Sequence, residues 1–172
     1  MHAERFYSYL RKARRELWTS LRTLSDEDLS RAVLPTEGAR CIKDLVFHIA
    51  AVEDGWFHLD LLGKPMVQVA FGLEPTSEDT YWHHETEPLE KLLAYWEAVE
   101  ADTLQLWPEL MAVAGSDQKI KAFDDRTETL SADEVLWHVM QHEVRHTAHI
   151  VQMMRLLGHK PPSLDYVFLM AH

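Results

Sequence analysis

Four long segments of this sequence repeat apolar residues at steps of three and four, which is the period of an amphipathic α-helix. They cover about residues 3–24, 41–62, 86–108 and 131–158. No segment alternates convincingly between apolar and polar residues, as a half-buried strand would. We therefore predict an all-α protein, a four-helix bundle with long loops. Because the chain has no internal repeat and no linker-like composition, we expect residues 1–172 to form a single domain.

Capping residues mark the predicted helix ends. Gly63 follows the second segment, and a residue without a Cβ suits a helix C-terminus. Thr86 can cap the third segment, Pro88 suits its first turn, and Pro108 is expected to limit it. The fourth segment opens with Ser-Ala-Asp-Glu at 131–134, which is a capping box.

The connections between these helices, at about residues 25–40, 63–85 and 112–130, are long for a bundle. Long loops inside compact domains are often functional. The middle connection contains Phe71 and the run Tyr-Trp-His-His at 81–84, so it is rich in aromatic and imidazole groups. We interpret it as a lid packed on one end of the bundle.

Charge and composition exclude several classes of protein. Seventeen basic and 28 acidic residues give a net charge of −11, which disfavours nucleic acid and anionic membranes as partners. The basic run at 11–16 is expected to form a solvated helix face. No apolar run approaches the ~18 residues of a membrane span, and the N-terminus lacks the apolar region of a secretory signal. Cys41 is the only cysteine, so no intrachain disulfide can form, and we expect a cytoplasmic protein.

Four of the eleven histidines lie in the fourth segment, at positions 138, 142, 146 and 149. At ~100° per residue they fall within one arc of the helix, which they share with valine, leucine and methionine. That stripe must face the core, where an imidazole is costly unless its nitrogens find partners. His142 and His146 are one turn apart, so both rings can reach one metal ion. We expect His138 and His149 to be outer groups of the same pocket.

A third ligand is expected from the second helix. His48 lies at the edge of that helix's apolar face, where a lone histidine would ordinarily be a core-edge side chain. Facing the stripe of the fourth helix, it completes a set of three. Three protein ligands with an open position are typical of catalytic or ligand-binding metal sites, whereas structural zinc sites are closed. We predict that His48, His142 and His146 bind a divalent ion, and zinc, nickel and iron all suit three imidazoles.

Residues 142–146 read H-E-V-R-H, which matches the H-E-x-x-H pattern of zinc proteases. The context argues against a protease. The extended pattern requires Gly and His where His149 and Gln152 stand, and Asp165 is the only acidic residue after the motif. Glu143 could act as a base on a metal-bound water, but we favour a solvated or supporting role. A di-iron site would need a second Glu-x-x-His, which we do not find.

Three stretches of the chain resemble the DinB-like, also YfiT-like, superfamily of metal-binding four-helix bundles. They are KDLVFHIAAVEDGW at 43–56, ADEVLWHVMQHEVRH at 132–146 and LGHKPPSLDY at 157–166. This superfamily includes mycothiol-dependent maleylpyruvate isomerases. The resemblance implies one metal ligand on the second helix and a His-x-x-x-His pair on the fourth, at His48, His142 and His146. It also implies a thiol-dependent S-transferase or isomerase that uses a divalent metal and a low-molecular-weight thiol on a small-molecule substrate.

The sequence departs from the family pattern at two places. Thr147-Ala148-His149 stands where many members have Arg-Gly-Gln, which alters a pocket wall. Cys41 stands where many members have a Ser or Thr helix cap. We expect Cys41 to be a small buried side chain; the alternative is a reactive thiol, because a helix N-terminus lowers a thiol pKa.

Other functions remain open at this point. One is a metal-dependent hydrolase on the same site. Another is a stress-related bundle that binds metal or a small ligand without turnover, and a last one is a metal-free structural module. A homodimer, common in the family, would use the apolar residues of the fourth helix that face away from the histidines. The alternative is that they pack under the long loops; they are Leu136, Met140, Val151 and Met154.

Overall fold

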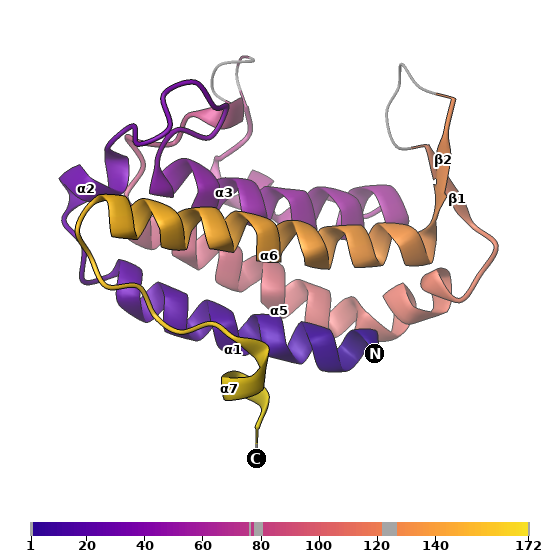
Figure 1. The fold of residues 1–172 in the computed structure, drawn as a ribbon. Helices are drawn as coiled ribbons and strands as arrows, with labels where there is room; N and C mark the ends of the chain where they lie inside the picture. The colour runs from indigo at the N-terminus through magenta and orange to yellow at the C-terminus, as the bar shows by residue number, and fades with distance from the viewer. Residues whose placement is uncertain (1, 76, 78–80, 122–126, 172) are drawn as a thin grey trace.

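The computed structural model of this chain describes residues 2–75, 77, 81–121 and 127–171. Four long helical segments run side by side, and α6 lies beside both α3 and α1 (Figure 1). The prediction of an all-α four-helix bundle is confirmed. The long segments are α1 (Ala3–Leu21), α3 (Ile42–Glu53) with its continuation η1 (Asp54–Leu61), α5 (Leu89–Ala114) and α6 (Ala132–Leu156). The short helices are α2 (Asp26–Ser30), η2 (Val67–Phe71) and α7 (Tyr166–Met170).

The second long helix changes its winding after α3, because η1 is a π-helix. A polar network ties this segment to α5. His58 Nδ1 lies 2.6 Å from Asp54 Oδ1, and the Tyr95 hydroxyl donates to Asp54 Oδ2 at 2.9 Å. All three side chains are fully buried. Their mutual hydrogen bonds satisfy polar groups that the core could not otherwise accept.

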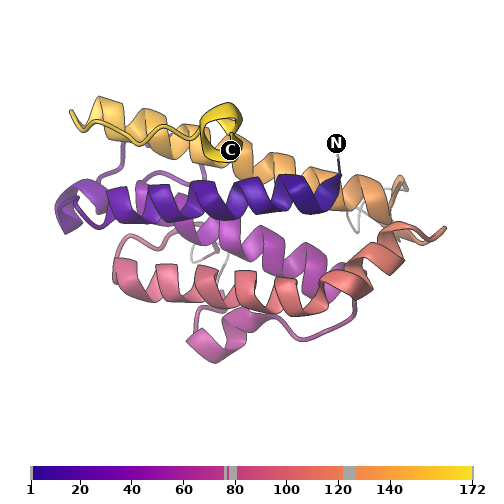
Figure 2. The same cartoon turned by 90° about the horizontal axis from the view of Figure 1, so that it is seen from below.

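The third long helix continues through Pro108, contrary to the prediction that this residue limits it. The helix begins at Leu89, with Pro88 rather than Thr86 at the N-cap. It changes direction toward its C-terminal end (Figure 2). A proline inside a helix costs about 3 kcal/mol. Leu110 lies beyond the proline and is fully buried in the core, so apolar burial offsets part of that cost.

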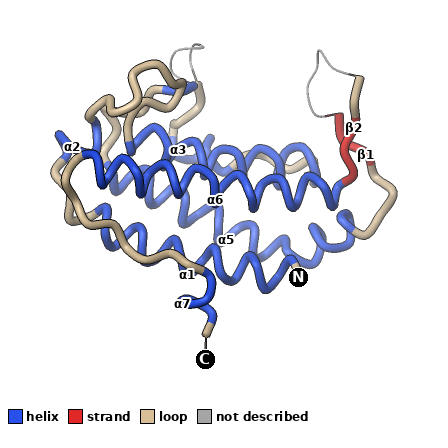
Figure 3. The backbone as a smooth tube through the Cα atoms, viewed as in Figure 1, coloured by secondary structure: helices blue, strands red, loops and turns tan. Residues whose placement is uncertain are grey.

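A short antiparallel hairpin precedes α6 (Figure 3), although we expected no strand. It pairs β1 (Lys119–Lys121) with β2 (Thr129–Ser131). Three residues are too few for an alternating pattern to be recognised in a sequence. The predicted capping box is present at the start of α6, where the Glu134 N–H donates to Ser131 Oγ at 3.2 Å.

The bundle core consists of two apolar clusters that hold both ends of the helices together. Leu136, Met140 and Met154 belong to them and are at most 1% exposed. The hypothesis of a dimer surface is therefore wrong for all three. The alternative, packing under the long loops, agrees with the clusters, which include residues of the long connections such as Leu73 and Ile120. Among the described residues, no helix is long and apolar enough to cross a membrane.

Candidate metal centre

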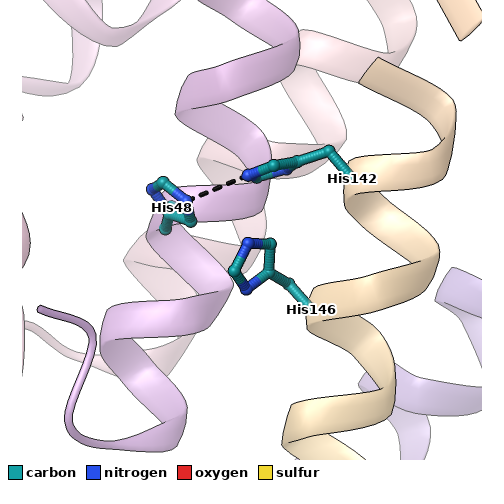
Figure 4. Close-up of side chains that lie close together, drawn as sticks. All are labelled: His48, His142 and His146. Carbon is teal, nitrogen blue, oxygen red and sulfur yellow. Dashed lines mark hydrogen bonds between the residues drawn. The ribbon is translucent and has the colours of Figure 1, made fainter. Parts of the chain in front are cut away.

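Three histidines from two helices meet at one point between α3 and α6 (Figure 4). His48 Nε2 lies 3.1 Å from His142 Nε2. The ring centroids of His142 and His146 are 4.2 Å apart, as expected for rings one helical turn apart. One nitrogen from each of the three rings lies within 4.8 Å of the others. The structure thus brings together the three residues that the sequence singled out, and their binding of an ion stays a prediction.

Burial makes these rings weak bases. His48 and His142 are 9% and 8% exposed, and His146 is half-buried. Burial lowers the pKa of His48 to about 4, of His142 to about 2 and of His146 to about 3, and the positive charge of Arg145 adds to the effect. At neutral pH all three rings are therefore uncharged. Each keeps a lone pair that a metal ion can use.

The donor set fits one divalent ion. Two nitrogens bound to a tetrahedral zinc ion lie about 3.3 Å apart, close to the 3.1 Å between the Nε2 atoms of His48 and His142. Within the described chain, Nδ1 of His142 and Nδ1 of His146 are buried without a hydrogen-bond partner. These Nδ1 atoms lie across each ring from Nε2, so it is the Nε2 spacing that supports an ion here. The widest separation of 4.8 Å means that at least one ring must move to complete the set.

Arg145 lies at the edge of the histidine cluster, one residue before His146. Its Nη2 donates a hydrogen bond to His146 Nε2 at 3.0 Å. Arginine has no lone pair to offer, so His146 must be the acceptor. The arginine therefore engages a lone pair that a metal ion could use.

A cavity of about 340 Å³ opens beside the cluster. Its walls include Gly38 from the loop before α3, the Trp82 ring, and His149 and Arg145 from α6. The Trp82 ring lies 5.0 Å from the His48 ring, centroid to centroid. A Cβ atom added at Gly38 would come within 3.0 Å of the Trp82 ring, so this loop and this ring pack closely. Trp82 thus closes one side of the pocket, in line with the expected lid, although residues 76 and 78–80 of that connection lie outside the described residues.

Asp44 holds the Trp82 segment against the start of α3. Its Oδ2 accepts from the N–H groups of Arg40 and Cys41 at 2.9 and 3.1 Å. Its Oδ1 accepts from the His84 N–H at 2.7 Å. One carboxylate therefore caps the helix that carries the first histidine and fixes the segment that carries Trp82.

Cys41 is a buried side chain and not a reactive thiol. It is 1% exposed, and burial raises the pKa of its thiol to about 12. The interpretation as a small buried residue is confirmed. The alternative fails because desolvation outweighs the effect of the helix N-terminus on the thiolate.

Glu143 points away from the histidines, although it follows His142 directly. It is 4% exposed and accepts from Arg14 Nε at 2.8 Å and from Arg14 Nη2 at 2.6 Å. We expected a solvated or supporting side chain, with a base beside the metal as the alternative. The solvated side chain and the base are wrong, because the carboxylate is buried against Arg14. The reason is the helical turn, since the next residue along α6 faces α1 instead of α3.

Arg14 is the centre of a buried network that joins all four long helices. Besides Glu143 on α6, it contacts Glu53 Oε2 on α3 at 2.5 Å and Glu100 Oε2 on α5 at 3.1 Å. It is 1% exposed, so the expectation of a solvated face at 11–16 is wrong for this residue. Burial opposes its charge, but the nearby carboxylates outweigh it and raise the pKa of Arg14. A signal was present in the sequence, because Arg14 lies within the apolar stripe of the first helix, four residues after Leu10.

The two outer histidines of α6 differ in position. The His149 ring is 5.3 Å from the His146 ring and lines the cavity, although its side chain is exposed. His138 is exposed, and its ring is 6.0 Å from the His142 ring and outside the cavity lining. Of the two, only His149 is a wall of the pocket.

The sequence was also compared with known proteins. The family model described as "DinB family" matches residues 1–172. None of the curated proteins compared with this sequence matches it.

Proposed function

The chain belongs to the DinB family, and from this premise we propose that it is a metal-dependent enzyme. His48, His142 and His146 would hold the divalent ion, for which zinc, nickel and iron are candidates. The convergence of three uncharged histidines on one point carries the proposal. The group contains three potential ligands and no fourth among the described residues, which favours an open catalytic site over a closed structural one.

We propose a thiol-dependent S-transferase or isomerase as the reaction type. A bound ion would supply Lewis-acid chemistry at the position that the protein leaves open. Neither of the chain's own candidates can act on a ligand at this site. Cys41, the candidate nucleophile, is buried with a raised thiol pKa, and Glu143, the candidate base, is hydrogen-bonded to Arg14. A nucleophile brought in by a small thiol cofactor fits this arrangement. A hydrolase fits this arrangement less well, because Glu143, the base that would activate a water, faces Arg14 instead of the histidines.

The first experiment is elemental analysis of protein purified without a His-tag or a nickel column. We expect about one divalent ion per chain. His48→Ala and His142→Ala should each lose it, because two imidazoles are too few to hold an ion in an open site. His138→Ala removes an exposed histidine of the same helix and should retain the ion.

Retention of the ion by His48→Ala would refute the three-histidine site. If the ion is present as expected, the loaded protein should consume a low-molecular-weight thiol in the presence of an electrophilic test substrate. Hydrolysis of activated esters should be measured in parallel. Hydrolysis without thiol consumption would favour the hydrolase, and neither reaction would favour a binding protein.

A further inference from the structure

Arg145 carries a positive charge that the described chain does not neutralise. Among the described residues, its guanidinium has one hydrogen-bond partner, His146 Nε2, a neutral acceptor at 3.0 Å. No carboxylate among the described residues forms an ion pair with it. The charge also contributes to lowering the pKa of His48, His142 and His146, after burial, so it acts on the whole cluster. This cation therefore faces the histidines while remaining available to a ligand.

A divalent ion held by three neutral rings would add two positive charges beside Arg145. Among the described residues, the pocket lining offers one carboxylate, Glu37, which is exposed and forms no ion pair with Arg145. Like charges at short range repel, and more strongly in a partly buried site than in water. The ion and Arg145 together would carry more positive charge than Glu37 can neutralise, which favours an anionic ligand in this pocket.

The shape of the pocket narrows the class of ligand. A guanidinium presents paired planar N–H groups that match the two oxygens of a carboxylate. The Trp82 ring and Leu45 supply apolar walls of the same cavity. The volume of about 340 Å³ is near the lower end of the range of about 300–1,000 Å³ for small-molecule sites. Such a pocket suits a small organic acid and is too small for a folded partner.

We propose that this pocket binds a small carboxylate anion, whose carboxylate Arg145 holds and whose apolar part packs against Trp82. The inference rests on the proposed function, since it takes the ion as bound at the histidines. It has one direct consequence. A carboxylate is a better partner for Arg145 than a neutral imidazole, so its binding releases His146 Nε2 for the ion. Metal and carboxylate should therefore each strengthen the binding of the other.

The test is calorimetric titration of zinc into the metal-free full-length protein, with benzoate as the carboxylate probe and benzamide as its neutral match. We expect benzoate to tighten zinc binding about tenfold, within the usual range for coupled sites, and benzamide to leave it unchanged. Arg145→Met should bind zinc at least as tightly as the unmodified protein without benzoate, because a competing donor and a repelling charge are gone. The benzoate effect should disappear in this variant.

Arg155→Met is the matched control, because Arg155 is an exposed arginine of the same helix that lines a different cavity. It should retain the full benzoate effect. Zinc binding without any benzoate effect, or an effect that persists in Arg145→Met, would overturn the carboxylate site and leave the metal site standing. An equal effect of inorganic phosphate would overturn the carboxylate as the ligand class. If no zinc binds, the proposed function fails as well.

Discussion

His142 and Glu143 are neighbours in the chain, yet their side chains serve different parts of the molecule. The histidine contacts His48 of α3, whereas the glutamate contacts Arg14 of α1. At the scale of a residue, the chemistry follows from these partners. The ring becomes a weak base because burial disfavours its charged form, and the carboxylate is bound to an arginine and cannot serve as a free base. A match to H-E-x-x-H therefore does not make this chain a protease.

Acidification should destabilise the metal-free protein before its carboxylates titrate. Histidine in an unfolded chain has a pKa of about 6.5, whereas His48, His142 and His146 have folded-state values of about 4, about 2 and about 3. Above about pH 6.5 the rings are neutral in both states. Below it the unfolded chain binds protons that the folded chain does not, so the free energy of unfolding falls as the pH falls. These three rings alone should contribute a slope approaching about three protons, or about 4 kcal/mol per pH unit. His84 and His138, whose pKa values burial also lowers, should add to it.

Urea unfolding of the metal-free protein between about pH 7.5 and about pH 5 measures this slope. His142→Gln is the control, because glutamine does not titrate. In this variant the free energy of unfolding should depend less steeply on pH, by the equivalent of about one bound proton. The same pH dependence in both proteins would show that His142 does not have a lowered pKa in the folded state.

At the scale of the helices, the Arg14 network links the elements that carry the histidines. Glu53 lies on the helix of His48, and Glu143 lies on the helix of His142. One guanidinium nitrogen, Arg14 Nη2, contacts both carboxylates, at 2.5 and 2.6 Å. This contact limits how far the two helices can separate, and so helps to set the distance between the histidines.

Arg14→Met should lower the free energy of unfolding by about 3–5 kcal/mol, because it leaves buried carboxylates without a cation. Arg15→Met is the matched control. Arg15 also contacts Glu100, but its side chain is 49% exposed, so its loss should cost about 1 kcal/mol or less. Urea unfolding of both variants at neutral pH compares them. Equal losses would mean that the buried network does not hold the helices together.

At the scale of the whole molecule, the proposed ion would join α3 to α6 and thereby stabilise the bundle. An ion that binds only the folded state at about one hundred times its Kd adds about 2.7 kcal/mol to the free energy of unfolding. For a chain of 172 residues this corresponds to a rise in Tm of about 5–11 °C. Thermal unfolding with and without zinc measures the rise. Magnesium, which prefers oxygen ligands, should cause none, and His142→Ala should lose the response to zinc.

A zinc-induced rise of the same size in His142→Ala would place the stabilising ion elsewhere on the molecule. A rise confined to the unmodified protein would agree with the elemental analysis by an independent, non-catalytic measurement.

The amphipathic stripes and the positions of the histidines on one of them follow from local spacing, because helical period is a property of consecutive residues. The sequence by itself was therefore enough to predict the bundle and to single out His48, His142 and His146 as candidate metal ligands. Only the tertiary structure decided which carboxylates pair with Arg14, that Pro108 lies inside a helix and that Trp82 covers His48. Each of these depends on residues distant in the chain, such as Arg14 and Glu143, which are 129 positions apart. The burial and charge of a side chain depend on such partners, and the spacing of neighbouring residues does not identify them.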